Sequence, residues 1–145
     1  MQRRKDSSMG RFSVDFEVKN YRDVVAAQSG TLAPDKVRSV RLRGVVDTGA
    51  SQLVLPRKAA QELGVRKGDR VRVRYADGRK ATRDSVDDIY IEMFGRHRVF
   101  TAIVEPKRED ALIGAIVLEA FDLLPDCSNQ CLVPRDPGIV TSEIE

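Results

Sequence analysis

The sequence is poor in the residues that several classes of protein depend on. It has two cysteines, one histidine and no tryptophan among 145 residues. Two cysteines are too few for a disulfide scaffold. Cys127 and Cys131 lie four positions apart with no histidine nearby, which is not a zinc-binding pattern. They either bridge a hairpin or stay reduced, and a reducing compartment favours the thiols. We expect no metal and no cofactor.

Long apolar runs are also lacking. The best candidate, residues 111–118, contains Gly114 and ends at Glu119, well short of the roughly 18 residues that a membrane-spanning helix needs. Residues 1–10 are basic, but no apolar segment follows them, so we expect a disordered tail rather than a signal peptide. A cytoplasmic location with no membrane partner is the resulting expectation.

Charge of one sign does not dominate either. The chain has 25 basic and 22 acidic residues, which describes a solvated surface. Residues 66–83 are an exception, with eight basic and two acidic side chains. This segment is either an edge hairpin protected by charge, the interpretation we favour, or a surface for an acidic or nucleic-acid-associated substrate. His97, the one histidine, has no positioned acid that would let it form a triad with Ser51.

One stretch points to chemistry. The apolar segment 42–46 leads into Asp47, and an Asp-Thr-Gly-Ala-Ser sequence follows before the chain returns to apolar Leu53. Aspartate is rare in strands, and burying it without partners costs roughly several kcal/mol. The stretch is therefore either a catalytic carboxylate delivered by a buried strand or an ordinary surface turn, since Asp and Gly favour turns.

The motif at 47–51 resembles the active-site motif of aspartic proteases, in particular the single-lobed retropepsin-like branch. A second element, Leu112-Ile113-Gly114, resembles the hydrophobic-hydrophobic-Gly segment that closes the active-site loop in that family. The resemblance spans about residues 37–134. It implies a mainly β chain with the retropepsin-like acid protease fold, a small closed β-barrel with two short helices.

Periodicity supplies the expected elements. We expect a disordered basic tail at 1–10, a folded domain at 11–135 and a polar tail at 136–145. Within the domain we expect strands at 12–18, 37–46, 70–74, 86–93, 99–104 and 131–133, a hairpin partner at 21–27, and helices at 56–63 and 115–123. The second helix should have Ile116, Ala120 and Leu123 on one side.

The resemblance also implies a mechanism. Peptide hydrolysis without a metal requires one carboxylate to take a proton from water and one neutral carboxyl to protonate the carbonyl oxygen. This chain holds one Asp-Thr-Gly, so the second carboxyl would come from Asp47 of a second copy. The expected function is a homodimeric aspartic endopeptidase that cleaves peptides or proteins. The alternative is an inactive dimerisation or peptide-binding module, and we do not expect nucleic acid as a partner.

The resemblance assigns roles to individual residues. Thr48 would hydrogen-bond to the partner loop, and the hairpin after Tyr75 would close over an extended peptide, although it has less glycine than is common in such flaps. The predicted catalytic residues are Asp47, Thr48 and Gly49. The predicted substrate-binding residues are Ala50, Ser51, Tyr75, Ala76, Asp77, Gly78 and Arg79. The predicted structural residues beneath the loop are Leu112, Ile113 and Gly114.

Overall fold

The structure is a computed structural model that describes residues 11–145. The tail expected at residues 1–10 lies outside this range. In chain order the elements are β1 (Arg11–Asn20), α1 (Tyr21–Gln28), the short 3-10 helix η1 (Pro34–Lys36), β2 (Ser39–Asp47), β3 (Leu53–Pro56), α2 (Arg57–Leu63), β4 (Lys67–Arg74), β5 (Lys80–Met93), β6 (Arg96–Glu105), β7 (Ala111–Ile113), α3 (Ala115–Phe121), β8 (Leu123–Asp126) and β9 (Cys131–Pro134).

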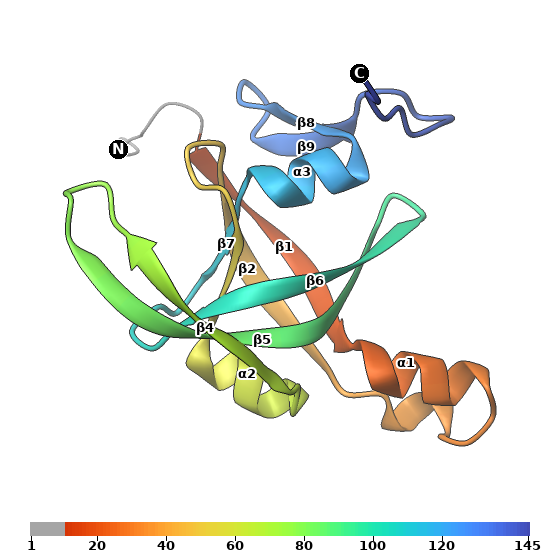
Figure 1. The fold of residues 1–145 in the computed structure, drawn as a ribbon. Helices are drawn as coiled ribbons and strands as arrows, with labels where there is room; N and C mark the ends of the chain where they lie inside the picture. Colours follow the sequence, from red (N-terminus) through yellow and green to blue (C-terminus); the bar gives the residue numbers. More distant parts are fainter. Residues whose placement is uncertain (1–10) are drawn as a thin grey trace.

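Six strands form a closed barrel (Figure 1). Their order is β1-β2-β7-β3-β6-β5, and pairing between β1 and β5, with Val18 opposite Ile91, completes the ring. The remaining strand of this sheet, β4, pairs with β5 alone and lies outside the ring. A small antiparallel sheet of β8 and β9 lies with α3 at one end of the barrel, while α1 and α2 lie at the other (Figure 1). The expected mainly β closed barrel is therefore confirmed.

Alternating apolar residues explain the barrel wall. In β1, Phe12, Phe16 and Val18 are buried while Asp15 and Glu17 point to solvent, which is the two-residue period of a strand with one wet face. All four residues of β3 are buried because β3 lies between β7 and β6. Burying one such leucine or valine contributes roughly 1.5–3 kcal/mol, so this interior holds the ring in shape.

The structure corrects the expectation for residues 21–27, which form helix α1 and not a hairpin partner of the first strand. The side chain of Asn20 accepts a hydrogen bond from the backbone N–H of Asp23 at 3.1 Å, which satisfies one of the free amides at a helix start. Strand β1 pairs instead with β2, with Phe12 opposite Val46, and with β5. Because of α1, the described chain has three α-helices where two were expected.

Helices α2 and α3 lie where the sequence predicted them. Helix α2 buries Ala59, Ala60 and Leu63 and ends at Gly64, whose φ of 65° is a left-handed cap. The predicted face of α3 is wrong, because Val117, Leu118 and Phe121 are buried while Ile116 is 42% exposed.

The polar segment after β9 contacts the body of the protein through Asp122. This buried carboxylate forms an ion pair with Arg135 at 2.6 Å and accepts the backbone N–H of Thr141 at 3.0 Å. These interactions lower the pKa of Asp122, with the Thr141 N–H as the largest cause. The last ten residues are thus attached at the end of the barrel that carries α3.

Three further properties are plain. Cys127 and Cys131 are not joined by a disulfide. Among residues 11–145, no three His, Cys, Asp or Glu side chains are grouped as a metal site would require. In the same part of the chain, no helix combines the length and apolar character needed to cross a bilayer.

Candidate functional site

The loop between β2 and β3 carries Asp47 as the last residue of β2. Both strands pair with β7, β2 in parallel with Val46 opposite Ile113, and β3 antiparallel with Leu53 opposite the same residue. This arrangement places the loop over the end of β7, where Gly114 follows. Segments about 65 residues apart in the sequence are thereby brought together.

Backbone amides fix the conformation of the Asp47 loop. The Gly49 N–H donates to Asp47 Oδ1 at 2.9 Å, and the Ala50 N–H donates to the Asp47 carbonyl at 3.1 Å. The carboxylate is 17% exposed, and its Oδ2 lies 3.2 Å from Nη2 of Arg11. One carboxylate oxygen is thus held by the loop, and the other faces a cation on the neighbouring strand.

Gly114 supports the loop from below, and only glycine fits there. A Cβ on this residue would collide with the carbonyl oxygen of Gln52 and would lie 2.7 Å from its nitrogen and 2.8 Å from the carbonyl oxygen of Ala50. These are backbone atoms, which cannot rotate away as a side chain can. Its φ of −91° is ordinary, so close packing rather than backbone conformation requires the glycine.

The first amides of α3 also hold the loop. The Ala115 N–H donates to the Ala50 carbonyl at 2.8 Å, and the Ile116 N–H donates to the Ser51 carbonyl at 3.0 Å. The initial amides of a helix lack partners within the helix, so these bonds satisfy both groups. They also set the rotation of α3, which explains why Ile116 faces outward.

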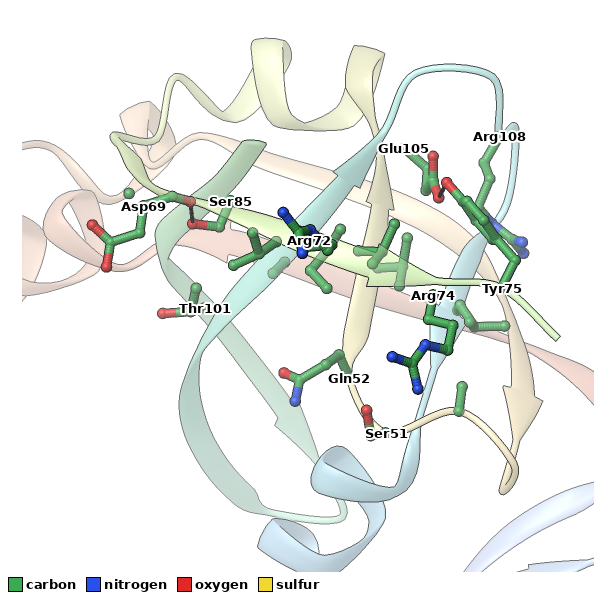
Figure 2. Close-up of a pocket in the computed structure, with 18 of the residues that line it drawn as sticks. Ser51, Gln52, Asp69, Arg72, Arg74, Tyr75, Ser85, Thr101, Glu105 and Arg108 are labelled. Atoms are coloured by element: carbon green, nitrogen blue, oxygen red, sulfur yellow. Dashed lines mark hydrogen bonds between the residues drawn. The ribbon is translucent and has the colours of Figure 1, made fainter. Parts of the chain in front are cut away.

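A groove of about 850 Å³ runs from this loop along β4 and β6 (Figure 2). Five of the predicted site residues line it: Gly49, Ala50, Ser51, Tyr75 and Leu112. Asp47 and Thr48 do not line it, although they belong to the same loop as Gly49. The carboxylate of one chain is therefore beside the groove rather than inside it.

Strands β4 and β5 form a hairpin, and the residues that connect them, 75–79, form a tight turn. The Gly78 N–H donates to the Tyr75 carbonyl at 2.9 Å, and Gly78 has a φ of 89°, a region that favours glycine. Arg79 forms an ion pair with Asp77 at 2.7 Å, and its hydrogen bond lowers the pKa of Asp77. The predicted substrate contacts Ala76, Asp77, Gly78 and Arg79 lie outside the groove in this single chain.

Tyr75 attaches the hairpin to the barrel. Its hydroxyl donates to Glu105 Oε2 at 2.5 Å, and Arg83 Nε donates to the other oxygen of that carboxylate at 2.7 Å. The guanidinium of Arg79 lies over the tyrosine ring, 4.9 Å from its centre. Burial, followed by the neighbouring Glu105 carboxylate, raises the pKa of Tyr75. This network holds the C-terminal end of β4 against the C-terminal end of β6.

Several polar residues of the groove were not among the predicted site residues. Arg72 and Arg74 come from β4, and Arg108 comes from the loop after β6. The alternation of arginines with Val71 and Val73 showed that β4 has a charged side, but the sequence did not show what that side faces. The other unpredicted polar residues of the groove are Gln52, Asp69, Ser85, Asp87, Thr101 and Glu105.

Comparison with known proteins identifies the family. A family model described as "gag-polyprotein putative aspartyl protease" matches residues 33–120, which are 88 of the 145 residues and include both the Asp47 loop and Gly114. The chain therefore belongs to this aspartyl protease family, and its fold is retropepsin-like.

Among solved structures, the chain is similar to EIAV protease complexed with the inhibitor HBY-793. The identity is 22%, the TM-score is 0.45, and the match covers 55% of this chain and 76% of that chain. No match was found among curated proteins.

Proposed function

We propose that the protein is a homodimeric aspartic endopeptidase, with one Asp47 from each chain forming the catalytic pair. The observation that carries this proposal is the construction of the Asp47 loop. The Gly49 amide orients one carboxylate oxygen, Gly114 and the start of α3 support the loop, and the family model covers all of these residues. We assign the activity to residues 11–135, with residues 1–10 and 136–145 outside the catalytic domain.

The need for two chains follows from the chemistry. One carboxylate takes a proton from the attacking water, and one neutral carboxyl protonates the carbonyl oxygen of the substrate. Two like charges a few Å apart cannot both ionise readily, which keeps one proton on the pair. Within residues 11–145, the acidic groups nearest the groove, Asp69, Asp87 and Glu105, belong to strands β4, β5 and β6 and not to a second loop of this kind.

The neighbouring residues take supporting roles in this proposal. Thr48 is exposed and does not line the groove, and its hydroxyl would reach the matching loop of the second chain. Gly49, Ala50 and Ser51 would bind the peptide backbone as an extended strand. The hairpin tip with Ala76, Asp77, Gly78 and Arg79 would close over the peptide from above.

A second function, an inactive module that binds peptides or forms dimers, has an observation in its favour. The Asp47 carboxylate forms an ion pair with Arg11 and lies outside the lining of the groove. In an inactive module that ion pair would persist.

A cytoplasmic site of action accords with either function, because unbridged Cys127 and Cys131 suit a reducing compartment.

A peptide library separates the two functions. Wild type and Asp47→Asn are incubated with mixed peptides over a pH range of about 4 to 8, chosen around the titration of carboxyls and histidine, and their masses in solution are measured. We expect cleavage by the dimeric wild type, a loss of activity per chain on dilution, and no cleavage by a dimeric Asp47→Asn. A folded wild-type dimer that cleaves nothing would indicate the inactive module.

A further inference from the structure

At one end of the groove, two arginine side chains have no carboxylate partner among residues 11–145. Arg72 and Arg74 are exposed on β4, and within residues 11–145 neither forms an ion pair with a carboxylate. Arg70, on the same strand, does pair with Asp84, at 3.7 Å, and does not line the groove. The two groove arginines are thus available to a ligand.

The acidic residues of the groove are engaged or distant from this end. Glu105 is occupied by Arg83 and Tyr75. Asp87 accepts a hydrogen bond from Thr101 at 3.1 Å. In Figure 2, Asp69 and Thr101 lie at the end of the groove away from Ser51, whereas Arg74 points toward Ser51. The groove therefore has an acidic end and a basic end, and the basic end adjoins the Asp47 loop.

We infer that the groove selects peptides with a glutamate or aspartate side chain close to the cleaved bond, bound by Arg74 with Arg72 beside it. This inference rests on the proposed function, which makes the groove the substrate site. Guanidinium groups bind carboxylates through two parallel hydrogen bonds, and a strand-like peptide along β4 would place alternate side chains toward that strand. Arg108, whose Nε is held by the Asp110 carbonyl at 2.9 Å, adds positive charge to the same groove.

A nucleic acid strand fits the groove less well than an acidic peptide. Its phosphates repeat along the whole strand, so a strand following the groove would bring phosphates against Asp69 and Asp87 at the far end. A peptide carries charge only where its sequence has a charged side chain. The observed division into two ends thus favours a peptide with an acid near the Asp47 loop and no acid further along.

The test compares cut sites and binding. A mixed peptide library is cleaved at low salt by wild type, by Arg74→Glu and by Arg70→Glu, the last being a matched arginine on the same strand outside the groove. We expect wild type and Arg70→Glu to enrich Glu and Asp near the cut, by about threefold to tenfold for one or two exposed ion pairs. Arg74→Glu should lose this preference or select Lys and Arg instead.

Binding to Asp47→Asn gives a second readout that needs no cleavage. The probes are the labelled peptide Ac-Ala-Ala-Glu-Val-Phe-Glu-Ala-Ala and its counterpart with glutamine in place of glutamate, with a single-stranded 12-nucleotide oligomer as competitor. We expect tighter binding of the acidic peptide, and its loss when Arg74→Glu is added. Equal binding of both peptides, or tighter binding of the oligomer through Arg74, would overturn the inference.

The two proposals fail in different ways. Cleavage with no acidic preference in wild type would overturn the selection of acidic side chains and leave the protease intact. No cleavage, with binding of the acidic peptide that depends on Arg74, would overturn the protease and leave the recognition of acidic peptides intact.

Discussion

Arg11 Nη2 lies 3.2 Å from Asp47 Oδ2, and the two residues are directly opposite each other in the pairing of β1 and β2. The register of the first strand thus places a guanidinium on the carboxylate that the proposed mechanism needs. The Arg11 side chain is 56% exposed, so the ion pair can open without disturbing the barrel.

Removing this cation should increase the proposed peptide cleavage. In Arg11→Gln the carboxylate is free to approach the Asp47 of a second chain, and we expect kcat/KM to rise by up to about fivefold, the limit set by an exposed ion pair of at most about 1 kcal/mol. The measurement is the rate of peptide cleavage over a dilution series. The control is Arg41→Gln, which replaces an exposed arginine near the start of β2, away from Asp47. Unchanged or lower activity in Arg11→Gln would show that Arg11 does not restrict Asp47.

Gly114→Ala should disrupt the Asp47 loop. The added methyl group meets the backbone of Gln52 and Ala50, and overpacking of this kind costs about 1–3 kcal/mol or more. We expect a lower urea midpoint and loss of cleavage. Gly138→Ala is the control, because its Cβ would meet only Asp136, at 3.6 Å. A Gly114→Ala variant as stable and active as wild type would contradict the close packing.

Tyr75→Phe should loosen the hairpin and change the alkaline stability. At pH 7 the lost hydrogen bond to Glu105 should lower the free energy of unfolding by about 0.5–1.5 kcal/mol. The folded-state pKa of Tyr75 is raised, so the stability it contributes is complete below its ordinary pKa of about 10 and is lost as the pH rises through the raised value. The difference between wild type and Tyr75→Phe should therefore narrow above pH of about 10.

Denaturant melts at several pH values measure this difference. Tyr21→Phe is the control, because the Tyr21 hydroxyl makes no hydrogen bond to protein within residues 11–145. A gap between wild type and Tyr75→Phe that stays constant from neutral to strongly alkaline pH would argue against a tyrosine held neutral by burial and Glu105.

Asp122→Asn should detach the segment after β9. Asparagine tolerates the left-handed backbone of this residue, whose φ is 56°, so the change removes the charge and leaves the turn. The folded-state pKa of Asp122 is lowered, so its stabilising effect is present above about pH 4 and lost as the pH falls through the lowered value. We expect a lower melting temperature at pH 7 and a shrinking difference in acid.

Thermal melts of Asp122→Asn and of Asp15→Asn, an exposed residue of β1, test this expectation. Proteolysis of the last ten residues should also become faster in Asp122→Asn alone. Equal melting temperatures at pH 7 would mean that the ion pair with Arg135 and the bond to Thr141 add nothing to the fold.

The strands and the elements of the loop could be predicted because their signals are local, whereas the closed barrel was implied by the resemblance of the 47–51 and 112–114 motifs to retropepsin-like proteases. Alternating residues mark β1 and β4, the acid and glycine mark the turn at 47–51, and the pair Ile113-Gly114 marks its support. The sequence-based prediction failed at α1, where residues 21–27 were expected to be a hairpin partner of the first strand. The deciding interaction there is the Asn20 cap, whose side chain also donates to the Leu63 carbonyl 43 residues away at 2.9 Å.

The composition of the groove could not be predicted in the same way. That Arg74 and Arg108 line one groove depends on how β4 pairs with β5 and β5 with β6. Both pairings shift register at an irregularity, between Lys67 and Arg70 and between Val86 and Ile89. An extra residue in a strand changes which side chains face inward beyond it, and no short pattern in the sequence announces this.

Because β4 lies outside the closed ring, its exposed side chains can be redesigned separately from the barrel. Each of the six barrel strands has hydrogen-bonded neighbours on both sides, whereas β4 is attached by β5 alone. Its groove-facing arginines are exposed, so exchanging them disturbs neither the ring nor the buried interior. The proposed ligand would thus lie on a strand whose exposed side chains can be exchanged, and new ligand preferences could be built there while the barrel keeps its stability.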